Sequence, residues 1–276
     1  MKVSINQALK NVTSEKYNKQ NIFLLFIIIL TTGILSLFIP AEIQNPELAR
    51  KLIPGEYVAL LTEPKTMTIL FLSFFLSLFL CGYNITATNN AIHEREEICP
   101  NPFTNIGNIF INGLSSFVGC LLVYCLIVIL TLIPTILLTI ISPTFIILIF
   151  FLVLVMVHAW LCVFFKFCMT LEFKEWFSFK SSWIMIANNA RRYGSYIGKG
   201  ILLSITYFAL CFLAGLLIGL VQGMIGASSL AETSTNVLLA IVGSIFTCLF
   251  YVYSIDLTAQ LLAPIVKKEA EETVQE

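Results

Sequence analysis

The residues that most resemble a catalytic motif in this chain are His93-Glu94-Arg95-Glu96-Glu97. They begin like the helical motif His-Glu-x-x-His, in which two imidazoles four residues apart bind zinc and the glutamate acts as a base. Here Glu97 occupies the place of the second histidine. The motif therefore predicts a solvated acidic turn and no metal site.

Residues 194–200, Gly-Ser-Tyr-Ile-Gly-Lys-Gly, superficially resemble a phosphate-binding loop. The spacing is one residue short, and the hydroxyl residue expected after Lys199 is replaced by glycine. We interpret this stretch as a flexible entry to a helix, and no cofactor is expected.

A polar site inside the membrane is the remaining chemical candidate. Asp256, the one aspartate of the chain, lies toward the end of the last apolar segment, and Gln260 follows one helical turn later. His158 lies toward the end of the fourth apolar segment, at a similar depth. An ionisable group at membrane depth is costly and often functional. Two alternatives stay open: a buried site of Asp256, His158 and Gln260, or an aspartate solvated at the membrane boundary.

Three glycines, Gly215, Gly219 and Gly223, recur every fourth residue of another apolar segment. Small residues at this spacing let two helix backbones approach closely. The spacing predicts tight helix packing and leaves open whether the partner helix belongs to the same chain.

The composition indicates how these residues are positioned. Hydrophobic residues make up 58% of the chain and charged residues 12%, whereas soluble domains have about 25% charged residues. The net charge is zero, which gives no reason to expect a nucleic-acid partner. We therefore expect an all-α, polytopic membrane protein in the lipid bilayer.

Apolar blocks of the length that crosses a bilayer define six predicted spans. The block 109–165 is long enough for two, and Ser142-Pro143 is the predicted turn between them. Pro134 should kink the preceding helix or end it early. The chain then divides into a polar segment 1–20, a membrane domain 21–265 and a tail 266–276, with spans at about 21–39, 67–86, 109–141, 144–165, 198–225 and 236–262.

Basic residues predict the orientation, because those near span ends are retained in the cytoplasm. With the amino terminus inside, 13 of the 16 Lys and Arg residues fall on the cytoplasmic side and 3 on the other. This predicts a multi-pass protein of the cell membrane with both termini in the cytoplasm.

The three predicted helical hairpins each follow a polar or amphipathic cytoplasmic segment, namely 1–20, 87–108 and 168–197. In the third, aromatic residues recur at helical spacing beside basic ones, which is typical of a helix lying in the headgroup layer. The expected interfacial residues are Trp176, Lys180, Trp183, Arg191 and Arg192.

A set of short motifs resembles a known family. The motifs are Gly82-Tyr83, Glu96-Glu97, Asn101-Pro102-Phe103, Ile106-Gly107-Asn108-Ile109-Phe110 and Asn112-Gly113-Leu114, followed later by the aromatic and basic run 176–196. From about Met67 onward the chain is similar to the prokaryotic membrane family catalogued as domain of unknown function 4013. The resemblance implies a polytopic prokaryotic membrane protein and no particular activity.

The sequence thus favours a non-enzymatic scaffold or accessory subunit that organises partners or lipids. The partner would be another membrane protein or a second copy of the chain. The alternative is a small transporter or lipid-handling protein with a polar site near Asp256 and His158. A membrane enzyme ranks third, because a catalyst needs convergent acid, base or metal groups.

Overall fold

The computed structural model describes residues 4–44, 48, 50, 54–141, 146–225 and 229–275. These residues contain helices and no strand, and six of the helices are long and apolar enough to cross a membrane. The predicted all-α fold with six spans is confirmed. The protein is a multi-pass integral membrane protein.

The membrane-spanning helices are α2 (Lys19–Ser36), α6 (Pro64–Ile92), α7 (Ile106–Ile141), α8 (Ile146–Thr170), α10 (Ala190–Ile225) and α11 (Ser229–Gln275). Shorter elements connect or precede them: α1 (Ile5–Val12), α3 (Ala41–Gln44), α5 (Pro54–Thr62), the 3-10 helix η2 (Phe173–Phe177) and α9 (Phe179–Asn188).

Most of the long helices extend beyond the apolar blocks that predict them. Helix α6 continues to Ile92, and α11 runs through nearly all of the predicted tail 266–276. Helix α7 continues through Pro134 to Ile141, so of the two predicted effects of this proline, a kink or an early end, the early end is wrong. A membrane helix can tolerate the loss of the backbone hydrogen bond that proline removes, because neighbouring groups satisfy the freed carbonyl. The predicted turn at Ser142-Pro143 lies outside the described residues.

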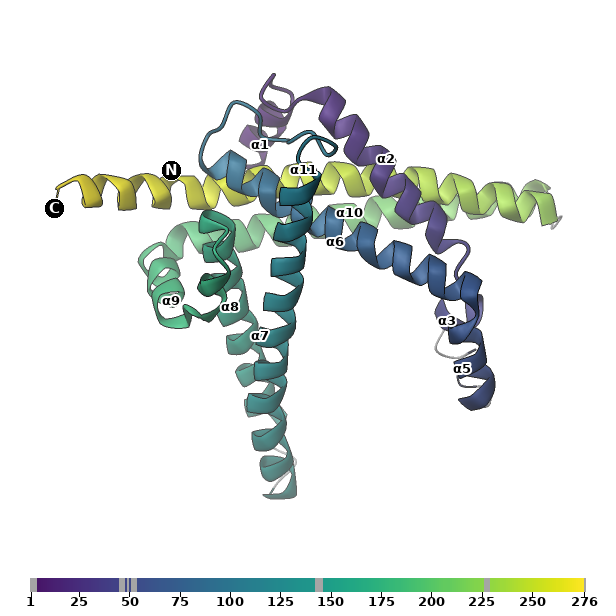
Figure 1. Ribbon diagram of the computed structural model, residues 1–276, viewed down its shortest axis with the longest axis horizontal. Helices are drawn as coiled ribbons and strands as arrows, with labels where there is room; N and C mark the ends of the chain where they lie inside the picture. The colour runs from purple at the N-terminus through teal and green to yellow at the C-terminus, as the bar shows by residue number, and fades with distance from the viewer. Residues whose placement is uncertain are drawn as a thin grey trace.

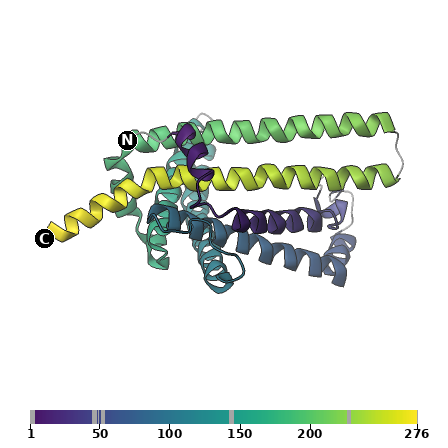
Figure 2. The same cartoon turned by 90° about the horizontal axis from the view of Figure 1, so that it is seen from above.

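Consecutive spans contact each other in three hairpins, α2 with α6, α7 with α8 and α10 with α11, and α6 also packs extensively against α7. Figures 1 and 2 show α10 and α11 side by side along the longest dimension, with α2 and α6 beside α11. The α7–α8 hairpin runs in a different direction and meets the others near one end (Figure 1). Helix α11 connects the arrangement, since it contacts α1, α2, α6 and α10.

The buried core lies mainly at the end where the hairpins meet. It is formed mostly by residues 83–92 of α6, 162–169 of α8 and 252–262 of α11, together with residues 98–99 and Trp176. We call this cluster the hub. Farther along the hairpins most large apolar side chains are exposed, as expected where lipid surrounds a helix.

The crossing of α6 and α7 depends on two glycines. A Cβ atom at Gly82 would overlap the carbonyl oxygen of Ile109 and lie 2.6 Å from the amide nitrogen of Gly113. A Cβ at Gly113 would overlap the carbonyl oxygen of Leu78 in the same way. The two backbones therefore touch at a point where only glycine fits.

Candidate functional site

Asp256 lies in the second half of α11, where this helix contacts α1, and it is 4% exposed. Its Oδ1 atom accepts hydrogen bonds from Asn11 Nδ2 and Tyr17 Oη, each at 3.0 Å. Its Oδ2 atom accepts a third from Gln260 Nε2 at 2.7 Å. A buried carboxylate is unfavourable unless donors surround it, and three donors supply that compensation here.

Gln260 extends this cluster to the start of the chain. Its Oε1 accepts a hydrogen bond from the backbone nitrogen of Ser4 at 2.7 Å, and its Nε2 donates to the Ser4 carbonyl at 3.1 Å. Ser4 precedes α1, and Tyr17 precedes α2. We call the contacts of Ser4, Asn11 and Tyr17 with Asp256 and Gln260 the N-terminal latch, because they hold both ends of the first segment on α11.

A cavity of about 500 Å³ lies beside the latch. Asp256 and Gln260 line one side of it, and the charged residues Lys16 and Glu94 line another. Glu94 also pairs with Lys267 of α11 at 2.7 Å. The cavity therefore has a mixed lining, in which charged side chains of both signs and amide side chains lie among apolar ones.

Two titrating groups at this cavity are perturbed. Burial raises the pKa of Tyr17, and the neighbouring Asp256 carboxylate raises it further, so the hydroxyl stays protonated and donates its hydrogen bond. The hydrogen bond from Lys267 lowers the pKa of Glu94 and favours its ionised form. The Lys267–Glu94 pair is exposed and adds little stability, about 0–1 kcal/mol for such pairs.

The structure brings Asp256 and Gln260 together but separates His158 from them. His158 Nδ1 lies 2.8 Å from the Leu154 carbonyl one turn earlier on α8, which requires the proton on Nδ1. Its ring meets Tyr193 edge-on, with centroids 6.1 Å apart. The proposed pairing of His158 with Asp256 is therefore wrong, because similar depth along two helices does not place their side chains on facing sides.

Two glycines of the predicted row on α10, Gly215 and Gly219, have no neighbour where a side chain would begin. A Cβ atom at Gly215 or Gly219 would meet no atom within 4 Å. The side-chain surroundings of Gly223 lie outside the described residues. The close helix approach in this chain instead involves Gly82 and Gly113.

Trp176 is fully buried within the protein, so the prediction that its side chain contacts lipid headgroups is wrong. Its indole packs against Gly119 of α7 and against two rings of α8, Phe164 and Phe167, at centroid distances of 6.2 and 5.2 Å. Aromatic rings at helical spacing suit a helix contact as well as a lipid contact, and the sequence does not distinguish the two.

The other predicted interfacial residues lie nearer the surface. Trp183 is 48% exposed, Lys180 and Arg191 are exposed, and Arg192 is half-buried. Their contact with lipid headgroups stays a prediction.

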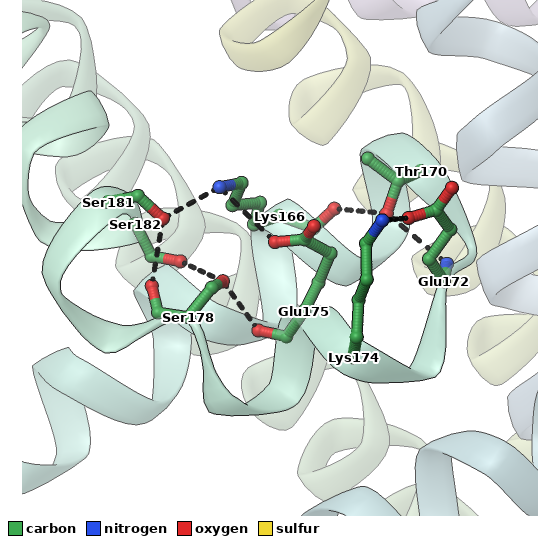
Figure 3. A network of polar contacts seen from close by, with 8 residues as sticks. All are labelled: Lys166, Thr170, Glu172, Lys174, Glu175, Ser178, Ser181 and Ser182. Carbon is green, nitrogen blue, oxygen red and sulfur yellow. Dashed lines mark hydrogen bonds and ion pairs between the residues drawn. The ribbon is translucent and has the colours of Figure 1, made fainter.

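A polar network connects the end of α8 to η2 and α9 (Figure 3). At the end of α8, Lys166 donates to Ser181 Oγ at 2.7 Å and forms an ion pair with Glu175 at 3.2 Å. Ser178 separates η2 from α9, and its hydroxyl donates to the Glu175 carbonyl at 2.7 Å. The helix expected in the segment 168–197 is thus divided here into two pieces, η2 and α9, which pack against α8.

Fluorescence quenching should distinguish Trp176 from Trp183. In variants that keep one tryptophan and replace the other two by phenylalanine, Trp176 should resist both aqueous iodide and brominated lipids, because protein surrounds it. Trp183 should be quenched by at least one of them. Strong quenching of Trp176 by brominated lipid would restore the interfacial interpretation.

Asparagines at the hub are the residues that sequence reasoning missed. Asn89 Nδ2 donates to the carbonyls of Cys168 and Met169, each at 2.9 Å, and so satisfies the open carboxyl end of α8. Asn21 Nδ2 donates to the Cys99 carbonyl at 2.8 Å. In the sequence, Asn21 and Asn89 lie at the ends of apolar blocks, and this position was the feature that could have identified them.

The acidic motif at residues 93–97 also has a structural role. His93 Nε2 lies 2.9 Å from the Met169 carbonyl, and Glu94 is held by Lys267. Among the described residues no group of three His, Cys, Asp or Glu side chains is close enough to hold a metal ion. These side chains connect α6 to α8 and α11.

Comparison with known proteins gives a family and no relative of known activity. Neither the curated proteins nor the solved structures compared with this chain include a match. The profile of a family described as protein of unknown function (DUF4013) matches residues 66–219, which is more than half of the chain. The matched region includes the α6–α7 glycine contact and ends before Asp256. The chain therefore belongs to the DUF4013 family, as its motifs suggest.

Proposed function

We propose that this protein is a non-enzymatic membrane scaffold or accessory subunit that organises a partner membrane protein. The exposure of α10 supports this most directly. Only 6% of its most apolar stretch is buried within the chain, against 17–33% for the other five spans. The polar groups of the latch and the asparagines of the hub, in contrast, bind the chain to itself.

The face of α10 that carries Gly215 and Gly219 suits a transmembrane helix of the partner. Lipid tails are as apolar as leucine, so helices associate in a membrane through close packing and not through hydrophobicity. Glycines with open space above them permit such an approach. The partner would be a different membrane protein or a second copy of this chain.

A large side chain placed in the row of Gly215 and Gly219 tests the proposal. We expect Gly219→Leu to remove a stoichiometric partner that copurifies with the wild-type protein in lipid nanodiscs. Thr206→Leu is the control: Thr206 is exposed on α10 nine residues before Gly215, and so on the opposite side of the helix. A partner retained equally by both variants, or a wild type that is monomeric and alone, would refute the proposal.

A small transporter or lipid-handling protein is the second candidate, favoured by the 500 Å³ cavity at Asp256. Such a protein exposes its site to each side of the membrane in turn. Ala263 lines the cavity, and a cysteine introduced by Ala263→Cys should then react with impermeant thiol reagents added on either side of the membrane. Reaction from a single side would argue for the scaffold.

We also propose that both termini face the cytoplasm of a cell, as the basic residues predict. Impermeant reagents added to intact cells should modify a cysteine placed at Glu56 and spare one placed at Lys180, on a background without other cysteines. Labelling of the Lys180 position from outside would reverse the topology.

A further inference from the structure

A second cavity, of about 320 Å³, lies at the hub end of α6 and α7 and is lined by these helices and the segment that joins them. Its lining is rich in amides and holds two residues of opposite charge. The lining residues used below are Asn90, Arg95, Glu97, Asn108 and Ile111. The cavity is separate from that at Asp256, and it has no role in the proposed binding at α10.

The two charges in this cavity are not neutralised by each other. Arg95 donates one hydrogen bond, from Nη1 to Asn90 Oδ1 at 2.9 Å, which positions the guanidinium and leaves other donors open. Arg95 and Glu97 are both exposed at the mouth of the cavity, and the Glu97 carboxylate has no hydrogen bond or ion pair within the described part of the chain. A ligand with one negative and one positive group would match both residues.

Arg95 and the start of α7 together suit a phosphate. A guanidinium binds phosphate oxygens through paired donors. Asn108 lies in the first turn of α7, and its side-chain amide has no hydrogen-bond partner among the described residues. The amino end of a helix adds a favourable field for an anion. Asn101 fixes this end, because its Oδ1 accepts a hydrogen bond from the Phe103 nitrogen at 2.9 Å.

The surroundings of the cavity point to a lipid as the source of that phosphate. Ile111 lines the cavity and is 60% exposed. Leu114 and Leu121 continue the same exposed side of α7 into its membrane-spanning part. A molecule whose polar end fills the cavity would therefore have its apolar part along this side of α7, in the lipid layer.

We propose that this cavity binds the headgroup of a zwitterionic phospholipid that carries a primary ammonium. The phosphate lies at Arg95 and Asn108, and the ammonium lies at Glu97. A primary ammonium has three N–H donors for the carboxylate, whereas a quaternary ammonium has none.

Native mass spectrometry of the full-length protein tests the site. The protein is exchanged into an equimolar mixture of phosphatidylethanolamine, phosphatidylcholine and phosphatidylglycerol with identical acyl chains. The wild type should retain phosphatidylethanolamine preferentially. Asn108→Asp should weaken that retention about tenfold, since it opposes the phosphate with a charge. An acidic residue in the first turn of α7 also favours the helix, so the fold should persist.

Matched controls separate the site from general charge effects. Gly107→Asp adds the same charge to the same helical turn outside the cavity lining and should retain the lipid. Glu97→Gln should abolish the preference for phosphatidylethanolamine over phosphatidylcholine, whereas Glu96→Gln should keep it.

Three results would overturn the proposal. The first is a wild type without preference among the three lipids, and the second is equal retention by Asn108→Asp and Gly107→Asp. The third is binding of soluble glycerophosphoethanolamine as tight as that of the diacyl lipid, which would exclude a lipid as the specific occupant. None of these measurements depends on the partner proposed for α10.

Discussion

Gly82→Ala should lower the apparent melting temperature of the purified protein markedly, whereas Gly219→Ala should leave it unchanged or raise it slightly. The added methyl group at Gly82 would overlap the backbone of Ile109, which has no rotamer by which to move away. Forced overpacking of this kind destabilises proteins by about 1–3 kcal/mol or more. For a chain of this size each kcal/mol corresponds to about 2–4 °C.

The same substitution at Gly219 meets open space. Alanine is there the better helix former, by about 1 kcal/mol. A melting temperature that falls with Gly82→Ala but does not fall with Gly219→Ala would indicate that the α6 and α7 backbones touch at Gly82. Thermal melting followed by loss of the monodisperse peak in gel filtration measures both variants. Equal melting of Gly82→Ala and wild type would show that the two backbones do not touch.

Asp256→Ala should release the first segment of the chain from α11. The substitution leaves Asn11 Nδ2 and Tyr17 Oη without their acceptor, and Gln260 Nε2 keeps only its bond to the Ser4 carbonyl. Each buried donor left unsatisfied costs about 1–3 kcal/mol. We expect faster hydrogen exchange and new protease cleavage over residues 4–18, together with a lower melting temperature.

Two further variants calibrate the effect at Asp256. Tyr17→Phe removes one of the three donors and should produce a smaller change in the same region. Glu94→Gln breaks an exposed ion pair and should change the exchange rates little. If Asp256→Ala exchanges no faster than Glu94→Gln over residues 4–18, the latch does not hold this segment.

The latch should also weaken in alkali. The pKa of Tyr17 in the folded protein lies above its ordinary value of 10.0. The contribution of this tyrosine is therefore complete below pH 10 and is lost as the pH rises toward the folded-state pKa. Hydrogen exchange of α1 should accelerate over that range in the wild type and less so in Tyr17→Phe.

The sequence by itself determined the spans. Apolar blocks of about 20 residues have no stable place except as helices in a bilayer, because the backbone must satisfy its own hydrogen bonds there. This local constraint is sufficient to predict six helices. The helix ends were less predictable, since helical hydrogen bonding in α6 and α11 continues into polar residues that hydropathy assigns to loops.

The tertiary structure decided which residues meet. The sequence marked Asp256 and Gln260 as a polar pair, but Asn11 and Tyr17 come from the opposite end of the chain. Likewise, the regular glycine row at Gly215 and Gly219 faces outward, and the less regular pair Gly82 and Gly113 makes the contact.

The sequence does not determine which helix faces meet, because the surrounding solvent of these helices is lipid and not water. In water, an apolar side chain at helical spacing marks the buried face, because burial removes it from water. In a bilayer, lipid and protein are equally apolar, so Trp176 against Gly119 and Trp183 on the surface have the same signature in sequence. Only the packing of the hairpins at the hub distinguishes the helix-facing residues from the others.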